Sequence, residues 1–91
     1  MGKAKIIYAN GTTKDVAPKN GKDFSYEELR EIVGGYIEIV HPKDTKKIMV
    51  VNEEGKLLGL ELNPEATKHY GQFPFDVIVG DALYCDADMV K

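Results

Sequence analysis

Apolar residues in this chain come in short runs separated by glycine, asparagine and proline, a pattern typical of short β-strands joined by tight turns. Residues 5–8 and 12–16 flank Asn10-Gly11, which is a strong signal for a two-residue hairpin turn. In residues 36–40, Ile37 and Ile39 would lie on one face of a strand and Tyr36, Glu38 and Val40 on the other. This alternation predicts a third strand.

The second half of the chain predicts the remaining strands. Residues 47–51 are apolar without alternation, which indicates a strand buried inside the sheet. Residues 52–55 predict a type I turn with a glycine bulge, and residues 56–60 then return as the next strand. After an extended connection at 72–75, a last strand or strand pair is expected at 76–79 and 82–85.

Two short helices are marked by their capping residues. Ser25 and Glu28 have the spacing of a capping box, which predicts a helix over 26–33 that ends at Gly34-Gly35. Asn63-Pro64 is typical of an N-cap followed by the first helical position, so a second helix is expected over 64–70.

Together these elements predict an α+β fold, with a mostly antiparallel sheet of five to six short strands and two helices. The length of 91 residues suits one domain, residues 1–91. Within it, residues 1–22 are expected to form an N-terminal hairpin and loop, and residues 86–91 a flexible tail.

Three segments of the sequence resemble a known family. They are LREIVGGYIE at 29–38, VVNEEGKLLGLELNPEAT at 50–67 and DVIVGDA at 76–82. With them the chain resembles the DUF3846 family over roughly residues 4–85. The resemblance implies a short single-domain protein from a phage, plasmid or conjugative element. It implies no established activity, and it supplies no catalytic residues.

Composition narrows the classes of partner. The net charge is −3, but residues 1–22 carry five lysines and one aspartate, whereas the rest of the chain carries seven basic and fourteen acidic residues. The lysines are spread over strands and loops and do not form a basic stripe, so a nucleic-acid partner is not expected. No apolar run approaches the roughly 20 residues that span a bilayer, and one cysteine fits a reducing compartment. We expect a soluble protein in the cytoplasm of a bacterial host.

Catalytic and metal-binding chemistry finds little support in the sequence. One cysteine, Cys85, and two histidines, His41 and His69, lack the spacing of a zinc site, so we expect neither a metal nor a cofactor. Cys85 lies in an apolar strand and is interpreted as a small core residue. A pairing of His69 with Asp76 as acid and base is the alternative, but the sequence predicts a protein that is not an enzyme.

The segment from Asn52 to Asn63 is the best candidate for a binding site. It places polar side chains near the start of the second helix, where free N–H groups favour anions. In the alternative interpretation, Asn52 only begins a turn and Asn63 only caps a helix. The candidate ligand-binding residues are Asn52, Asn63, Glu65, Thr67, Tyr36 and Tyr70.

Two functional hypotheses remain open. In the first, the chain is a non-enzymatic binding protein that sequesters a nucleotide-like small molecule in host-defence conflict. A domain of this size has little room for an enclosed pocket, so the ligand would lie between subunits of a homo-oligomer. In the second, the chain binds a host or phage protein through a sheet edge or its acidic surface, as an inhibitor or adaptor.

Overall fold

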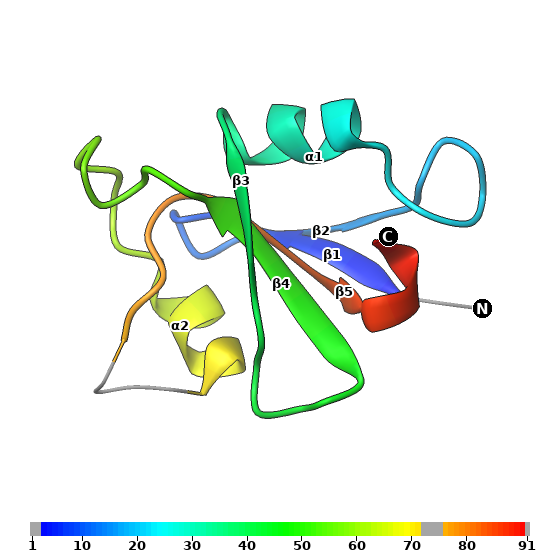
Figure 1. Cartoon of the computed structure of the whole chain (residues 1–91). Coiled ribbons are helices and arrows are strands. Elements are labelled where there is room, and N and C mark those ends of the chain that lie inside the picture. The colour runs from blue at the N-terminus through cyan, green and yellow to red at the C-terminus, as the bar shows by residue number, and fades with distance from the viewer. Residues whose placement is uncertain (1–2, 72–75, 91) are drawn as a thin grey trace.

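The computed structural model describes residues 3–71 and 76–90, and its centre is a five-stranded antiparallel sheet with a helix on each face (Figure 1). The sheet order is β2-β1-β5-β4-β3. The elements are β1 Ala4–Ile7, β2 Thr13–Val16, α1 Tyr26–Val33, β3 Ile37–Val40, β4 Lys47–Asn52, α2 Pro64–Tyr70, β5 Ala82–Asp86 and a 3₁₀ turn, Ala87–Met89. The predicted α+β class with an antiparallel sheet is confirmed.

The C-terminal strand β5 lies at the centre of the sheet. It pairs with β1 on one side, where Ala4 lies opposite Cys85, and with β4 on the other, where Ile48 lies opposite Cys85. β4 is flanked by β5 and β3, so the prediction that 47–51 lies inside the sheet is confirmed. Both faces of β4 are covered, which explains why its sequence does not alternate.

Helix α1 covers one face of the sheet. Leu29 and Val33 are buried in the same core as Ile48, Val50 and Leu83. The predicted capping box is present, because the Ser25 hydroxyl accepts from the Glu28 N–H and the Glu28 carboxylate accepts from the Ser25 N–H. This carboxylate also accepts from the Lys19 N–H, and these bonds hold the pKa of Glu28 below its usual value.

Helix α2 lies on the opposite face. Its Ala66 is buried with Ile7, Met49, Ile78 and Ala82 in a second core. Both helices have the predicted bounds, and each ends at a glycine in the left-handed conformation. No helix among the described residues is long and apolar enough to span a membrane.

The predicted strand at 56–60 is wrong. These residues form consecutive turns, in which the Leu58 N–H donates to the Glu54 carbonyl and the Leu60 N–H donates to the Gly55 carbonyl. The turn at 52–55 is present, with the Gly55 N–H donating to the Asn52 carbonyl at 3.1 Å. However, the glycine with positive φ is Gly59 rather than Gly55, so the predicted glycine bulge is absent and the chain does not return as a strand.

The strand prediction for 76–79 is also wrong. Only Val79 pairs, in an isolated bridge with Leu62. The neighbouring bonds run from the Asn63 N–H to the Ile78 carbonyl and from the Gly80 N–H to the Glu61 carbonyl. The prediction for 82–85 is confirmed as β5. The extended connection expected at 72–75 lies outside the described residues.

The segment expected to be a flexible tail makes defined contacts over its described residues, 86–90. Asp86 ends β5, forms an ion pair with Lys47 and accepts from the Lys3 N–H at 3.0 Å. These bonds hold the pKa of Asp86 below its usual value, led by the one from Lys47. Met89 is buried, and its carbonyl accepts from the Phe24 N–H at 2.8 Å. The segment therefore closes the end of the α1-side core.

Cys85 provides a test of this core. It is completely buried at the centre of the sheet, and burial raises the pKa of its thiol to about 12. We expect a thiol reagent at pH 8 to modify native Cys85 on the order of a thousandfold more slowly than the urea-unfolded chain, since reaction requires global unfolding. Mass spectrometry after timed labelling measures this. Comparable rates in the two states would show that Cys85 is not buried in the folded chain.

Candidate functional site

The most exposed apolar side chains of the described structure lie on one turn. We define residues 53–59 as the leucine turn, after Leu57, which is 88% exposed, and Leu58, which is 61% exposed. The turn follows β4 directly and extends beyond the C-terminal end of that strand (Figure 1). Leucine at such exposure in a turn does not contribute to the core, so burial does not explain its presence.

The backbone of the leucine turn is packed closely against the segment before β5. A Cβ at Gly55 would lie 2.9 Å from Val79 Cγ2, and one at Gly80 would lie 2.8 Å from Leu60 Cδ1. Glycine at both positions therefore allows close contact between the two segments. The Lys56 ammonium adds an ion pair with Asp76 at 2.5 Å. The turn is thus held in place while its two leucines are exposed.

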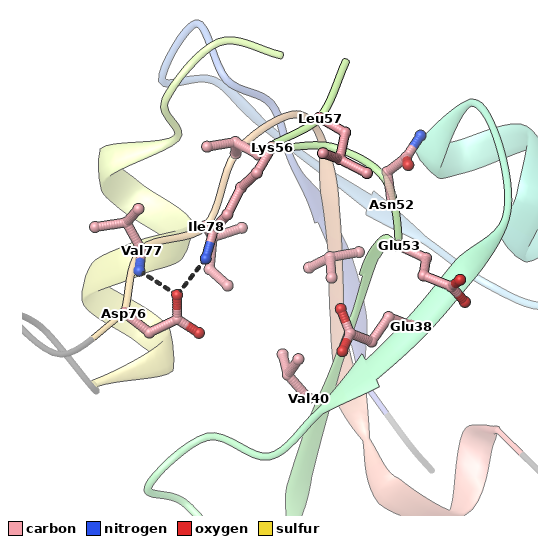
Figure 2. A pocket seen from close by; sticks show the side chains of 11 residues that line it. Glu38, Val40, Asn52, Glu53, Lys56, Leu57, Asp76, Val77 and Ile78 are labelled. Carbon is pink, nitrogen blue, oxygen red and sulfur yellow. Dashed lines mark hydrogen bonds and ion pairs between the residues drawn. The ribbon is translucent and has the colours of Figure 1, made fainter. Parts of the chain in front are cut away.

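A small cavity of about 100 Å³ lies between the leucine turn and β3 (Figure 2). Its lining combines aliphatic and acidic side chains with Lys56 and Asn52: Glu38, Val40, Val51, Glu53, Leu57, Asp76, Val77, Ile78 and Val79. Figure 2 shows the carboxyl groups of Glu38 and Asp76 on opposite sides of this cavity. The volume is well below the roughly 300 Å³ at which small-molecule pockets begin.

The charge around this cavity is negative. Asp76 accepts from Lys56 and from the Val77 N–H, and these bonds, with the Lys56 bond as the largest cause, hold the pKa of Asp76 below its usual value. Lys56 is the one basic side chain among the lining residues, and Asp76 already pairs with it. Glu38 and Glu53 are exposed and carry the remaining charge.

Asn52, a predicted ligand residue, is used inside the fold. Its side chain is nearly buried; its amide donates to the Val33 carbonyl at 3.1 Å and its oxygen accepts from the Glu54 N–H at 2.8 Å. It therefore ties the end of α1 to the end of β4 and to the first turn of the 53–59 segment. Figure 2 shows its amide directed away from Asp76.

Asn63 and Thr67 are also committed to internal bonds. The Asn63 oxygen accepts from the Ala66 N–H at 3.0 Å, and its amide donates to the carbonyls of Ile7 and Gly80, each at 2.8 Å. The Thr67 hydroxyl donates to the Asn63 carbonyl and accepts from Ile78 N–H at 2.9 Å. Both residues are buried. Asn63 caps α2, as the alternative interpretation expected, and it also joins α2 to β1.

Of the other three predicted residues, Glu65 and Tyr70 belong to α2, whereas Tyr36 lies just before β3. Glu65 contacts Lys68 and His69 on α2. Tyr70 ends α2 half-buried, and burial raises the pKa of its hydroxyl. Tyr36 is 56% exposed just before β3, with the Arg30 guanidinium 4.8 Å from its ring centre. The six predicted residues therefore do not form one site, since Asn52 contacts the end of α1 whereas Asn63 caps α2 across the sheet.

The structure does not bring the proposed acid–base pair together. His69 Nε2 lies 3.2 Å from the Lys5 ammonium, its Nδ1 lies 2.9 Å from the Glu65 carbonyl, and its ring packs edge-on against Tyr84. Asp76 pairs with Lys56. Within residues 3–71 and 76–90, no group of three or more histidine, cysteine, aspartate or glutamate side chains is placed to hold a metal ion.

The leucine turn was missed because its sequence reads as a strand. Lys56 to Leu60 is rich in apolar residues, and such a short run does not distinguish a buried strand from an exposed turn. The sequence does contain a signal for a turn, because Gly55 and Gly59 flank the leucine pair. Two glycines so close together are typical of a turn.

Comparisons with known proteins identify one relationship. The model of a family described as a domain of unknown function, DUF3846, matches residues 5–90. No curated protein and no solved structure matches the chain.

Replacing Asn63 tests whether this side chain stabilises the fold beyond its cap. Asn63→Ala should lower the free energy of unfolding by roughly 2–4 kcal/mol, because the cap is lost and the carbonyls of Ile7 and Gly80 lose their donor. Urea unfolding measures this change. Ser25→Ala is the control, since it removes an exposed cap worth about 1 kcal/mol. Equal losses in the two variants would show that the bonds to β1 and Gly80 add no stability.

Proposed function

The chain belongs to the DUF3846 family, for which no function is established, and we propose that it is a non-enzymatic protein-binding module whose contact surface is centred on the leucine turn. The observation that supports this proposal is the combination of two highly exposed leucines with a backbone held in place by glycine contacts. A preorganised apolar contact loses little entropy when it binds, so it suits protein recognition.

The charge around the leucine turn supports one kind of partner surface. Glu53 and Glu54 lie on the leucine turn itself. Glu38 lines the cavity beside the turn, and Glu61 follows the turn by two residues. All four side chains are exposed. Lys56 is paired with Asp76 and does not offset them. We infer a partner that offers an apolar pocket for the leucines, surrounded by lysine and arginine side chains, because complementary charge favours association and orientation.

The small-ligand hypothesis has weaker support. The polar atoms of Asn52 and Asn63 already have partners, and the cavity beside the leucine turn is too small for a nucleotide. A larger hollow of about 500 Å³ lies along Ile6, Val16 and Ile32, but it is an open groove with mixed charge. A phage origin, a role in host-defence conflict, a cytoplasmic location and a homo-oligomeric state stay predictions.

The proposal that the protein is not an enzyme is supported by the environments of Cys85 and His69. Cys85 is buried with a raised thiol pKa, and both ring nitrogens of His69 have partners in the fold. A nucleophile needs access and an adjacent base, which neither residue combines here.

A double variant, Leu57→Ser with Leu58→Ser, tests the proposed surface. Its free energy of unfolding should change by less than about 0.5 kcal/mol, because both side chains are exposed. Partners that wild type captures in its host should be purified and their affinities measured by calorimetry against both chains. We expect a loss of at least about tenfold for the variant, since exposed leucines that enter a pocket act as central contacts.

Leu62→Ser is the matched control, because Leu62 is half-exposed and lies outside the leucine turn. It should bind the same purified partner with wild-type affinity. Binding that is unchanged in the double variant, or reduced equally by the control, would contradict the proposal.

A further inference from the structure

We propose that the free edge of β3 binds an extended segment of the partner protein as an additional antiparallel or parallel strand, and that this segment alternates basic and apolar residues. The inference rests on the proposed protein-binding function. It adds the backbone of β3 as a binding group, and it shares the carboxylate of Glu38 with the surface proposed above. Strand addition at a sheet edge is a common way to bind an extended peptide.

The two edges of the sheet differ in their protection. β2, at one edge, is Thr-Lys-Asp-Val, and three of its four residues are exposed and polar. β3, at the other edge, is Ile-Glu-Ile-Val without lysine or proline, and Ile39 is 39% exposed. Lysine and proline are the usual means of preventing strand addition at an edge. β2 carries a lysine and an aspartate, whereas Glu38 is the one charge on β3, so β3 is the edge more open to another strand.

The hydrogen-bonding pattern between β3 and β4 shows which backbone groups of β3 could bond to an added strand. The Glu53 N–H donates to the Tyr36 carbonyl, and the register places Glu38 opposite Val51 and Val40 opposite Met49. In an antiparallel pair hydrogen-bonded positions alternate, so the backbone groups of residues 36, 38 and 40 face β4. Those of Ile37 and Ile39 face outward. Within the described residues, no other strand pairs with this edge.

Side chains on the two faces of β3 determine the composition of the incoming strand. Val40 packs in the α2-side core, so Glu38 shares that face and lines the acidic cavity. Ile37 packs in the α1-side core, and Ile39 shares that face. An added strand would therefore place lysine or arginine beside Glu38 and apolar residues beside Ile39, since cross-strand neighbours interact directly.

A second copy of this chain fits the edge poorly. If two β3 strands paired antiparallel about their centres, so that Ile37 and Ile39 of each copy exchanged bonds, Glu38 would lie directly opposite Glu38 of the other copy. Like charges in that position are destabilising. Glu53 would add further negative charge on each side. Charge complementarity therefore favours a basic segment of another protein.

The test uses the peptide acetyl-Thr-Val-Lys-Val-Lys-Val-Thr-amide as probe and amide NMR spectra of the full chain. We expect saturable shifts and slower hydrogen exchange at the amides of Ile37 and Ile39, with no change at Thr13–Val16 of β2. A peptide N-methylated at its central valine and one with both lysines replaced by glutamate should each bind at least about tenfold more weakly, because they lose backbone donors or charge complementarity.

Two variants of the chain complete the test. Glu38→Lys should weaken binding of the lysine peptide by about tenfold, because it converts an attractive cross-strand pair into a repulsive one. Glu31→Lys, at an exposed position of α1, should leave the affinity unchanged. Thermal unfolding of both variants checks that the fold is intact.

Three results would overturn the inference: equal shifts at β2, unchanged affinity of the N-methylated peptide, or a peptide-free dimer in which the Ile37 and Ile39 amides already resist exchange. The proposed function is tested separately by the leucines. If the Leu57→Ser, Leu58→Ser variant loses its protein partner while the peptide leaves β3 unaffected, the function stands and strand addition fails. If neither experiment shows binding, both fail.

Discussion

The side-chain amide of Asn63 makes three hydrogen bonds that join separate parts of the chain. Its oxygen begins α2, and its nitrogen donates to the carbonyls of Ile7 at the end of β1 and Gly80 just before β5. A buried amide that makes all of these bonds stabilises the folded state. Removing it would leave buried backbone groups without a hydrogen-bond partner, which lowers the free energy of unfolding. This side chain therefore joins the position of α2 on the sheet to the path of the chain into the central strand, and the Thr67 hydroxyl adds a bond to Ile78 beside it.

The leucine turn follows from the same arrangement. Because Gly80 is held by Asn63, the preceding residues lie close enough for Val79 to pair with Leu62 and to contact Gly55. The turn therefore packs against a segment that is itself fixed to the core. Leu57 and Leu58 remain exposed on a turn whose backbone packs against this segment.

The size of the domain explains why both proposed binding surfaces, the edge of β3 and the leucine turn, lie on its periphery. With 91 residues, the chain covers both faces of a five-stranded sheet, with one short helix on each face. Small domains bury a limited fraction of their surface and leave no room for a large enclosed pocket. The recognition proposed above therefore uses edges and turns. Here the open edge of β3 and the leucine turn lie beside one another across an acidic cavity, so one partner surface can contact both.

The sequence by itself determined both helices, the hairpin of β1 and β2 and the interior position of β4, because caps, turns and periodicity act between residues a few positions apart. It did not determine the site. Residues 56–60 are apolar enough for a strand, but the sheet gives them no partner, since β5 from the far end of the chain occupies the place beside β4. Only tertiary structure decides such long-range pairing, and with it whether Leu57 is buried or exposed and whether Asn63 binds a ligand or its own backbone.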